Sequence, residues 1–265
     1  MSQSHKQQSP FTVTFLGTGT SHGIPVITCD CLVCKSSNPK DKRFRSSILI
    51  ESESTSIAID VGPDFRMQML RSNVKHLDAI LITHEHRDHI AGLDDIRIFN
   101  YKKKGPFDLY CVKRVEDDIR HSWPYIFTPN PYPGIPSIEF KRINQAPFTI
   151  GDLNFEPLDV LHYKLPVKGF RIGDFAYITD VSHIPEETFE KLNGLDAVVL
   201  GALRRKPHIS HFSLEEAKEA AQRIGAKSTY FIHMSHDMGF HNEVEDELPS
   251  DMHLSYDGLK IKFGA

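Results

Sequence analysis

Four residues with metal-binding side chains lie within one short segment of the chain: His84, His86, Asp88 and His89. Imidazole nitrogens and carboxylate oxygens suit zinc, iron and manganese. A His-x-His pair alone would be more typical of a polar loop with surface histidines. The full spacing, at the end of a predicted buried strand, instead favours a turn that gathers these side chains around two metal ions.

A second cluster contains three thiols, at Cys29, Cys31 and Cys34. Cysteines so close in sequence make poor disulfides, and in a reducing compartment clustered cysteines are more often metal ligands. Three thiolates leave one position of a tetrahedral zinc site to a residue from elsewhere in the chain. The alternative is a set of three buried or incidental cysteines. Cys111 lies apart in a predicted strand and is expected in the core.

Hydrophobic patterning predicts the elements that position these ligands. Strands are expected at residues 11–16, 47–51, 56–60, 78–83, 107–112, 138–143, 148–160, 168–173, 175–179, 197–200, 230–233 and 259–263. Helices are expected at 64–70, 90–99 and 213–223. The last is the clearest, because Ser213 and Glu216 form a capping box and Gly225 ends it. This order predicts an α/β fold with two mixed sheets covered by helices, in one domain over residues 11–265.

The composition is that of an ordinary globular protein of 265 residues, with 40% hydrophobic residues, 25% charged residues and a formal net charge of −4. That charge does not favour nucleic-acid binding. No segment approaches the roughly 18 apolar residues of a membrane span. Residues 1–10 lack the apolar core of a secretory signal and are expected to form a disordered tail. We therefore expect a cytoplasmic protein without membrane contact, and the sequence leaves a homodimer open.

The chain resembles the metallo-β-lactamase superfamily, whose fold is an αββα sandwich. The resemblance covers nearly the whole chain and is carried by Ile57–Asp60, Thr83–Ile90, Asp159–His162, Tyr177–Asp180 and Phe231–His233. It implies one metal ion bound by His84, His86 and His162, and a second bound by Asp88, His89 and His233. It further implies that Asp180 bridges the ions and that Asp60 orients their ligands. His86 disfavours the flavodiiron branch, and Asp180 disfavours the zinc β-lactamases, which commonly have cysteine there.

Within the superfamily, the chain resembles the cyclic-phosphate phosphodiesterases of phosphonate breakdown. That resemblance rests on the cysteine cluster, Leu16–Thr20, Gly23–Pro25, His233–His236 and Tyr256–Leu259. It implies that His236 completes a structural zinc site. It also implies that His211, just before the capped helix, is an active-site residue that binds no metal. Pyrroloquinoline quinone biosynthesis B proteins have a similar cysteine cluster, whereas the tRNA 3′-processing endonucleases are more distant.

The predicted function is hydrolysis of a small phosphodiester, cyclic substrates included, with two active-site manganese or zinc ions and one structural zinc. A hydroxide shared by the two metals would attack phosphorus, and Asp180 and His211 would be catalytic. The alternatives are lactone or thioester hydrolysis, iron-dependent redox chemistry, nucleic-acid 3′-end processing, and a non-catalytic zinc-stabilised binding protein.

Three further features carry weaker expectations. A run of three basic residues indicates either a second phosphate-binding site or a solvated stretch of charge; it consists of Arg204, Arg205 and Lys206. His22 is expected to be a turn residue. The segment 101–136 has no specific match, and its Pro-rich part, 124–136, is expected to be a long loop of the kind that forms lids.

Overall fold

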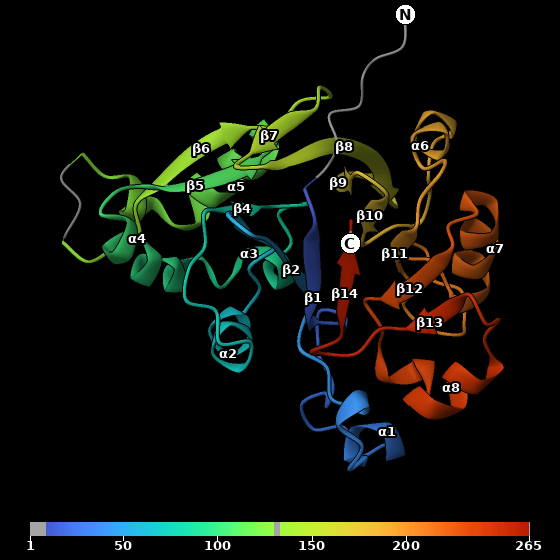
Figure 1. Ribbon diagram of the computed structural model, residues 1–265. Helices are drawn as coiled ribbons and strands as arrows, with labels where there is room; N and C mark the ends of the chain where they lie inside the picture. Colours follow the sequence, from blue (N-terminus) through green and yellow to red (C-terminus); the bar gives the residue numbers. More distant parts are fainter. Residues whose placement is uncertain (1–8, 130–132, 265) are drawn as a thin grey trace, which may run out of the picture.

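The fold is built from two seven-stranded sheets, in the computed structural model that describes residues 9–129 and 133–264 (Figure 1). In the first sheet the strand order is β14 (Lys260–Phe263), β1 (Phe11–Gly17), β2 (Ser47–Ser52), β3 (Ser56–Ile59), β4 (Ala79–Leu81), β5 (Phe107–Cys111) and β6 (Ile138–Arg142). Neighbouring strands are antiparallel from β14 to β3 and parallel from β3 to β6.

The second sheet repeats this mixed pattern. Its order is β13 (Met252–Leu254), β12 (Ser228–Ile232), β11 (Ala197–Gly201), β10 (Phe175–Ile178), β9 (Leu165–Ile172), β8 (Leu153–His162) and β7 (Phe148–Ile150). Neighbours are parallel from β13 to β10 and antiparallel from β10 to β7. Each sheet therefore has one parallel half, in which several strands end at the same edge.

The two sheets pack face to face over a core of large apolar side chains. Phe15 and Ile50 from the first sheet cluster with Phe155, Phe170 and Val199 from the second, and all five are fully buried. Burying a side chain of this size stabilises the fold by about 1.5–3 kcal/mol. Because the sheets also carry apolar side chains on their outer faces, they need further cover there.

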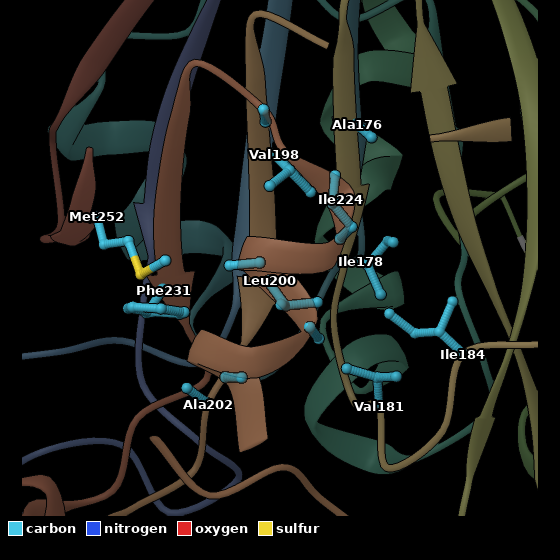
Figure 2. Close-up of a cluster of buried hydrophobic side chains, with 14 of the residues drawn as sticks. Ala176, Ile178, Val181, Ile184, Val198, Leu200, Ala202, Ile224, Phe231 and Met252 are labelled. Atoms are coloured by element: carbon cyan, nitrogen blue, oxygen red, sulfur yellow. The ribbon is translucent and has the colours of Figure 1, made fainter. Parts of the chain in front are cut away.

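Helices provide that cover on both outer faces. Phe65, Phe99 and Val115, from α2 (Phe65–Arg71), α4 (Arg97–Lys103) and α5 (Lys113–Ser122), pack on the first sheet. The second sheet is covered by α7 (Leu214–Ile224) and α8 (His241–Glu247). Figure 2 shows Ile224 of α7 beside Leu200 and Ile178 of the sheet. The αββα sandwich predicted from the sequence is confirmed.

The remaining helices are short. They are α1 (Leu32–Lys35), α3 (Arg87–Ile90), α6 (Glu186–Lys191) and the 3₁₀ turns at Pro39–Asp41, Leu93–Ile96, Pro124–Phe127 and His236–Met238. In the part of the chain described, no helix combines the length and apolar character needed to cross a bilayer. The predicted tail falls mostly on residues 1–8, which lie outside the described residues, as do residues 130–132 of the Pro-rich loop.

Two elements that were predicted to be continuous are interrupted in the structure. The helix expected at 90–99 is broken at Gly92, where a Cβ would lie 2.3 Å from the carbonyl oxygen of Gly62. The strand expected at 148–160 is a hairpin, β7 and β8, that turns at Gly151. Gly151 has φ +56°, and Asp152 next to it accepts hydrogen bonds from Ser52 and Thr55, both at 2.6 Å. These contacts with a distant hairpin fix the turn.

Candidate metal centre

The ends of several strands deliver the candidate ligands to one place. Asp60 follows β3, His84 follows β4, Asp180 follows β10 and His233 follows β12, while His162 is the last residue of β8. With the exception of Asp60, the ligand atoms of these strand-end residues and their neighbours fall into groups whose members lie within 4.8 Å of one another. The sheets therefore converge on a single cluster of histidines and carboxylates.

Three of these strand-end residues have left-handed backbone conformations. The φ angles are +65° at Asp60, +49° at Asp180 and +64° at His233. Residues with a Cβ avoid this region at a cost of about 1–2 kcal/mol each. Such outliers concentrate where a side chain must be aimed for function, and here each one belongs to the cluster.

Asp180 lies between two groups of ligand atoms. Its Oδ1 is 3.4 Å from Nε2 of His89 and 3.2 Å from Nε2 of His233, and Asp88 completes this first group. Its Oδ2 is 3.8 Å from Nε2 of His84, which groups with His86. One carboxylate oxygen thus faces each group, as a bridging ligand requires.

His162 and His211 form a third group with Asp180. The Nδ1 of His162 donates to the carbonyl oxygen of Ser210 at 2.6 Å, so its Nε2 carries the free lone pair. The ring centroid of His162 is 5.1 Å from that of His86, and that of His211 is 4.8 Å from that of His233. The structure therefore brings together all the histidines that the sequence predicted for the active site.

Within residues 9–129 and 133–264, several buried nitrogen atoms of the cluster find no hydrogen-bond partner. They are Nε2 of His84, Nε2 of His89, and both ring nitrogens of His233. Leaving a buried polar atom unpaired costs about 1–3 kcal/mol, so several together need an explanation. Nitrogen and carboxylate donors of this kind are the ligands that zinc and manganese bind in proteins, so the residues fit divalent metal ions.

Asp60 supports the cluster through hydrogen bonds from His89 and Thr83. It is fully buried and accepts a hydrogen bond from Nδ1 of His89 at 2.7 Å. It also accepts from the backbone N–H of Thr83 at 2.9 Å and from its hydroxyl. A carboxylate on Nδ1 leaves the Nε2 lone pair of His89 directed at the site, which is how histidine ligands are commonly oriented.

The electrostatics of His84, His162 and Asp180 favour metal-binding protonation states. Burial lowers the pKa of His84 well below its usual range and also lowers that of His162. Burial acts to raise the pKa of Asp180, but His233 and His89 hold it well below its usual range. Neutral imidazole and ionised carboxylate are the forms that coordinate metals. Burial acts to lower the pKa of His89, but the carboxylates of Asp88, Asp180 and Asp60 raise it well above its usual range, so a metal ion would have to displace a proton there.

The cysteine cluster closes on His236. Its Nδ1 lies 3.3, 3.4 and 3.5 Å from the sulfur atoms of Cys29, Cys31 and Cys34. Tetrahedral zinc with ordinary bond lengths would place sulfur and nitrogen about 3.6 Å apart. The backbone N–H of Cys34 lowers the pKa of Cys31 to about 6, whereas burial raises the pKa of Cys34 to about 11. The four side chains fit a zinc ion.

A depression of about 430 Å³ opens beside the cluster. It is lined by His86, His162, Tyr163, Lys164, Leu165 and Ser210. Tyr163–Leu165 were not predicted from the sequence, because their only signal is their position directly after His162. Glu85, which stands between two of the histidines and pairs with Arg114, was also missed.

Arg204 and Arg205 are held by contacts within the protein. Arg205 forms a two-pronged ion pair with Glu247, and Arg204 donates to the carbonyl oxygens of Lys206 and Pro207. These contacts favour a structural or solvated run of charge over a phosphate site. His22 is exposed in a turn, as expected.

The chain is similar in sequence to proteins of known family. The chain is 40% identical over 248 residues to an octanoyltransferase of Porphyromonas gingivalis, covering 92% of this chain and 50% of that protein. It therefore spans about half the length of this curated relative. A ribonuclease Z of Bradyrhizobium diazoefficiens is 34% identical over 85 residues, covering 31% of this chain and 23% of the enzyme.

Two solved structures show the same fold. A diphosphatase from the PhnP family is 40% identical with a TM-score of 0.90, covering 96% of this chain and 98% of that one. Zinc-bound PqqB from Methylobacterium extorquens is 17% identical with a TM-score of 0.76, covering 94% and 99%. Residues 55–234 match the family described as the Beta-lactamase superfamily domain. The chain is a member of this superfamily and has its metal-dependent hydrolase fold.

Proposed function

We propose that the protein hydrolyses a small phosphodiester, linear or cyclic, with two divalent metal ions. The observation that carries the proposal is Asp180, whose two oxygens face separate ligand groups. The ions would be manganese or zinc. One would be held by His84, His86 and His162, the other by Asp88, His89 and His233, with Asp180 shared. A third ion, a structural zinc, would be held by Cys29, Cys31, Cys34 and His236.

Two bound divalent ions would supply an activated water and neutralise charge on the phosphate. His211, whose ring lies beside those of His162 and His233, adds a group that can hold a proton at the centre. Burial and the neighbouring His233 lower its pKa to about 3, so the free imidazole is neutral and keeps one N–H to donate. Hydrogen bonding to an anionic phosphate oxygen favours the protonated form of His211, which can then pass its proton to the leaving oxygen.

A diphosphate is the second candidate substrate. The relative with 40% identity and 98% coverage is described as a diphosphatase. Displacement at phosphorus needs the same groups whether the leaving oxygen belongs to an alcohol or to a second phosphate. The depression of about 430 Å³ suits a small molecule of either kind. The net charge of −4 does not favour a polynucleotide.

The test is hydrolysis of bis-p-nitrophenyl phosphate by the protein loaded with manganese or zinc, together with metal analysis. Asp180→Asn suits the left-handed backbone at this position, since asparagine tolerates it. We expect Asp180→Asn to lower the rate at least ~100-fold and to release active-site metal while one zinc stays bound. Asp196→Asn, far from the centre in a different cavity, is the matched control.

Two results would overturn the proposal: a native protein that cleaves no phosphodiester or diphosphate, or an Asp180→Asn variant with native rates. Parallel assays with a lactone, a thioester and a precursor tRNA separate the alternative hydrolases. Faster turnover of any of these would replace the phosphodiester as the preferred substrate.

A further inference from the structure

The turn between β8 and β9 forms one wall of the depression beside the candidate metal centre. Tyr163 and Lys164 link His162, the last residue of β8, to Leu165, the first of β9. All four line the depression, together with His86 and Ser210. Because His86 and His162 are also candidate metal ligands, a substrate phosphate on the metals would leave its remaining groups against this turn.

Tyr163 occupies a backbone conformation that tyrosine disfavours. Its φ is +57°, in the left-handed region where glycine or asparagine would fit without strain. Tyr163 is 51% exposed, so burial of the ring does not offset the cost. The two-residue turn between paired His162 and Leu165 itself requires a positive φ, whereas a tyrosine in place of glycine or asparagine at this exposed position points to a use for its ring.

The strained turn is held firmly. The backbone N–H of Tyr163 donates to the hydroxyl of Ser182 at 2.8 Å. The backbone N–H of Ser182 in turn donates to the carbonyl oxygen of Leu161 at 2.8 Å. These bonds tie the turn to the segment that follows Asp180. The backbone that carries the Tyr163 ring is therefore fixed, so a ligand would have to order only the rotation of the side chain.

Lys164 adds a positive charge beside the aromatic ring of Tyr163. Its ammonium nitrogen lies 5.3 Å from the centroid of the Tyr163 ring, and none of the ion pairs found within residues 9–129 and 133–264 includes it. A lysine beside an exposed aromatic ring matches a ligand that has both an anionic group and a flat group.

We propose that Tyr163 and Lys164 form a subsite that selects phosphoesters of nucleosides, with the base stacked on Tyr163 and a second phosphate paired with Lys164. The inference rests on the proposed function, since it assumes that the hydrolysed phosphate lies on the metals. An alkyl chain would also find apolar contacts at Leu165 and at the exposed Ile209 beside Ser210. It would gain nothing from the planarity of the ring, so the nucleobase is the better fit.

Calorimetric titration of the metal-loaded protein tests whether a base stacks on Tyr163. Adenosine 5′-monophosphate, methyl phosphate and octyl phosphate share the metal-binding phosphate and differ in the attached group. We expect the native protein to bind adenosine monophosphate at least ~10-fold more tightly than methyl phosphate, the range typical of stacking one base on an aromatic side chain. Tyr163→Gly, which relieves the backbone strain, should remove this preference while methyl phosphate binding stays unchanged. Tyr163→Phe should keep the preference.

The charged half is tested with adenosine 5′-diphosphate. We expect the diphosphate to bind more tightly than the monophosphate, with an advantage that falls as salt increases and disappears in Lys164→Gln. Tyr101→Ala and Lys262→Gln, which alter an exposed tyrosine and an exposed lysine elsewhere, should behave like the native protein.

The failure of this subsite is distinguishable from the failure of the proposed function. If the native protein cleaves bis-p-nitrophenyl phosphate but binds adenosine monophosphate no better than methyl phosphate, the subsite is refuted alone. Octyl phosphate binding as tightly as adenosine monophosphate, or a full base preference in Tyr163→Gly, would also refute it. If no phosphodiester is cleaved and methyl phosphate does not bind, the hydrolase proposal fails first.

Discussion

At the scale of single residues, the centre depends on a division of roles among histidines with different environments. His89 is anchored on Asp60 and His162 on the carbonyl oxygen of Ser210, and each anchor leaves Nε2 free for a metal. Unlike them, His211 has no anchoring bond among the hydrogen bonds described, although its ring centroid lies 4.3 Å from that of His162. An unanchored imidazole beside the ligands is suited to proton transfer.

His211→Asn should therefore impair turnover without removing metal. We expect kcat to fall about 10²- to 10⁴-fold, the usual contribution of a positioned acid or base. Metal content should stay at the native value. Steady-state kinetics and elemental analysis on the same preparation provide the measurement, and His121→Asn on the surface of α5 is the control. Loss of a metal ion from His211→Asn would instead make His211 a ligand.

The local sequence identified only part of this centre. His84, His86, Asp88 and His89 could be recognised together because they are adjacent in the chain. His162, Asp180 and His233 lie far apart, and only the resemblance to a family connected them. Tyr163 and Lys164 have no chemical signature of their own, and their place beside the centre follows from the hairpin that brings them there.

At the scale of elements, the cysteine cluster and the metal centre share one short segment. His233 belongs to the centre and His236 to the cysteine cluster, and Met234 lies between them. The backbone N–H of Met234 donates to the carbonyl oxygen of Thr18, and its own carbonyl oxygen accepts from Thr20, both at 3.0 Å. The loop that contains the cysteines is thereby joined to the segment that positions His233.

Cys31→Ser should show this coupling. We expect the variant to lose one zinc per chain and several degrees of thermal stability, because zinc binding at such sites contributes directly to folding. It should also bind active-site metal more weakly, because His233 loses support from His236. Thermal melts and competition with a chelator measure the two effects. Cys111→Ala, a core variant, should keep its zinc, and an unchanged metal content in Cys31→Ser would contradict the zinc site.

The cap of α7 offers a second test at this scale. Ser213 accepts a hydrogen bond from the backbone N–H of Glu216, whose carboxylate accepts from the backbone N–H of Ser213 at 2.8 Å. Ser213→Ala should lower the free energy of unfolding by about 1 kcal/mol, measured by urea denaturation. The exposed Ser250→Ala is the control. A variant as stable as the native protein would show that the capping box contributes nothing.

Elements with strong local signals were predicted and those defined by distant contacts were not. The helix expected at 213–223 is α7, since its cap and its terminal Gly225 are encoded nearby. By contrast, α5 begins after Val112, whose side chain makes no capping hydrogen bond. Its helical conformation depends on burial of Val115 and Ile119 against the first sheet.

At the scale of the whole molecule, a buried polar network links the cysteine-containing loop to the C-terminal part of the chain. Arg43 is 5% exposed and donates to Thr18, to the carbonyl oxygen of Ser255 and to Nδ1 of His241. Burial, then the charges of Arg43 and Lys40, lower the pKa of His241 to about 4. The folded protein therefore holds His241 in its neutral form.

This network makes stability depend on pH. Between the ordinary histidine pKa of about 6.5 and about 4, the unfolded chain binds a proton at His241 that the folded chain does not. The stability that this site contributes is complete above pH 6.5 and is lost as pH falls, by about 2 kcal/mol at pH 5. Between pH 7 and pH 5, we expect the free energy of unfolding of His241→Gln to fall by about 2 kcal/mol less than that of the native protein. Urea denaturation at both pH values measures the difference, in which the contribution of the metal ligands cancels. Equal losses in the two proteins would contradict a neutral His241.

The left-handed backbone at Asp60, Asp180 and His233 has a consequence for how such a protein changes under selection. With metal withheld, glycine at His233 would relieve strain and remove two unpaired buried nitrogens, so selection for thermal stability alone should enrich glycine there. At Asp60 the hydrogen bonds with Thr83 and His89 would be lost, and this opposes the same change. Each such substitution removes a member of the centre, so the most stable members of that population should be inactive. In a library selected this way, the positions at which glycine becomes enriched are those where activity and stability make opposite demands.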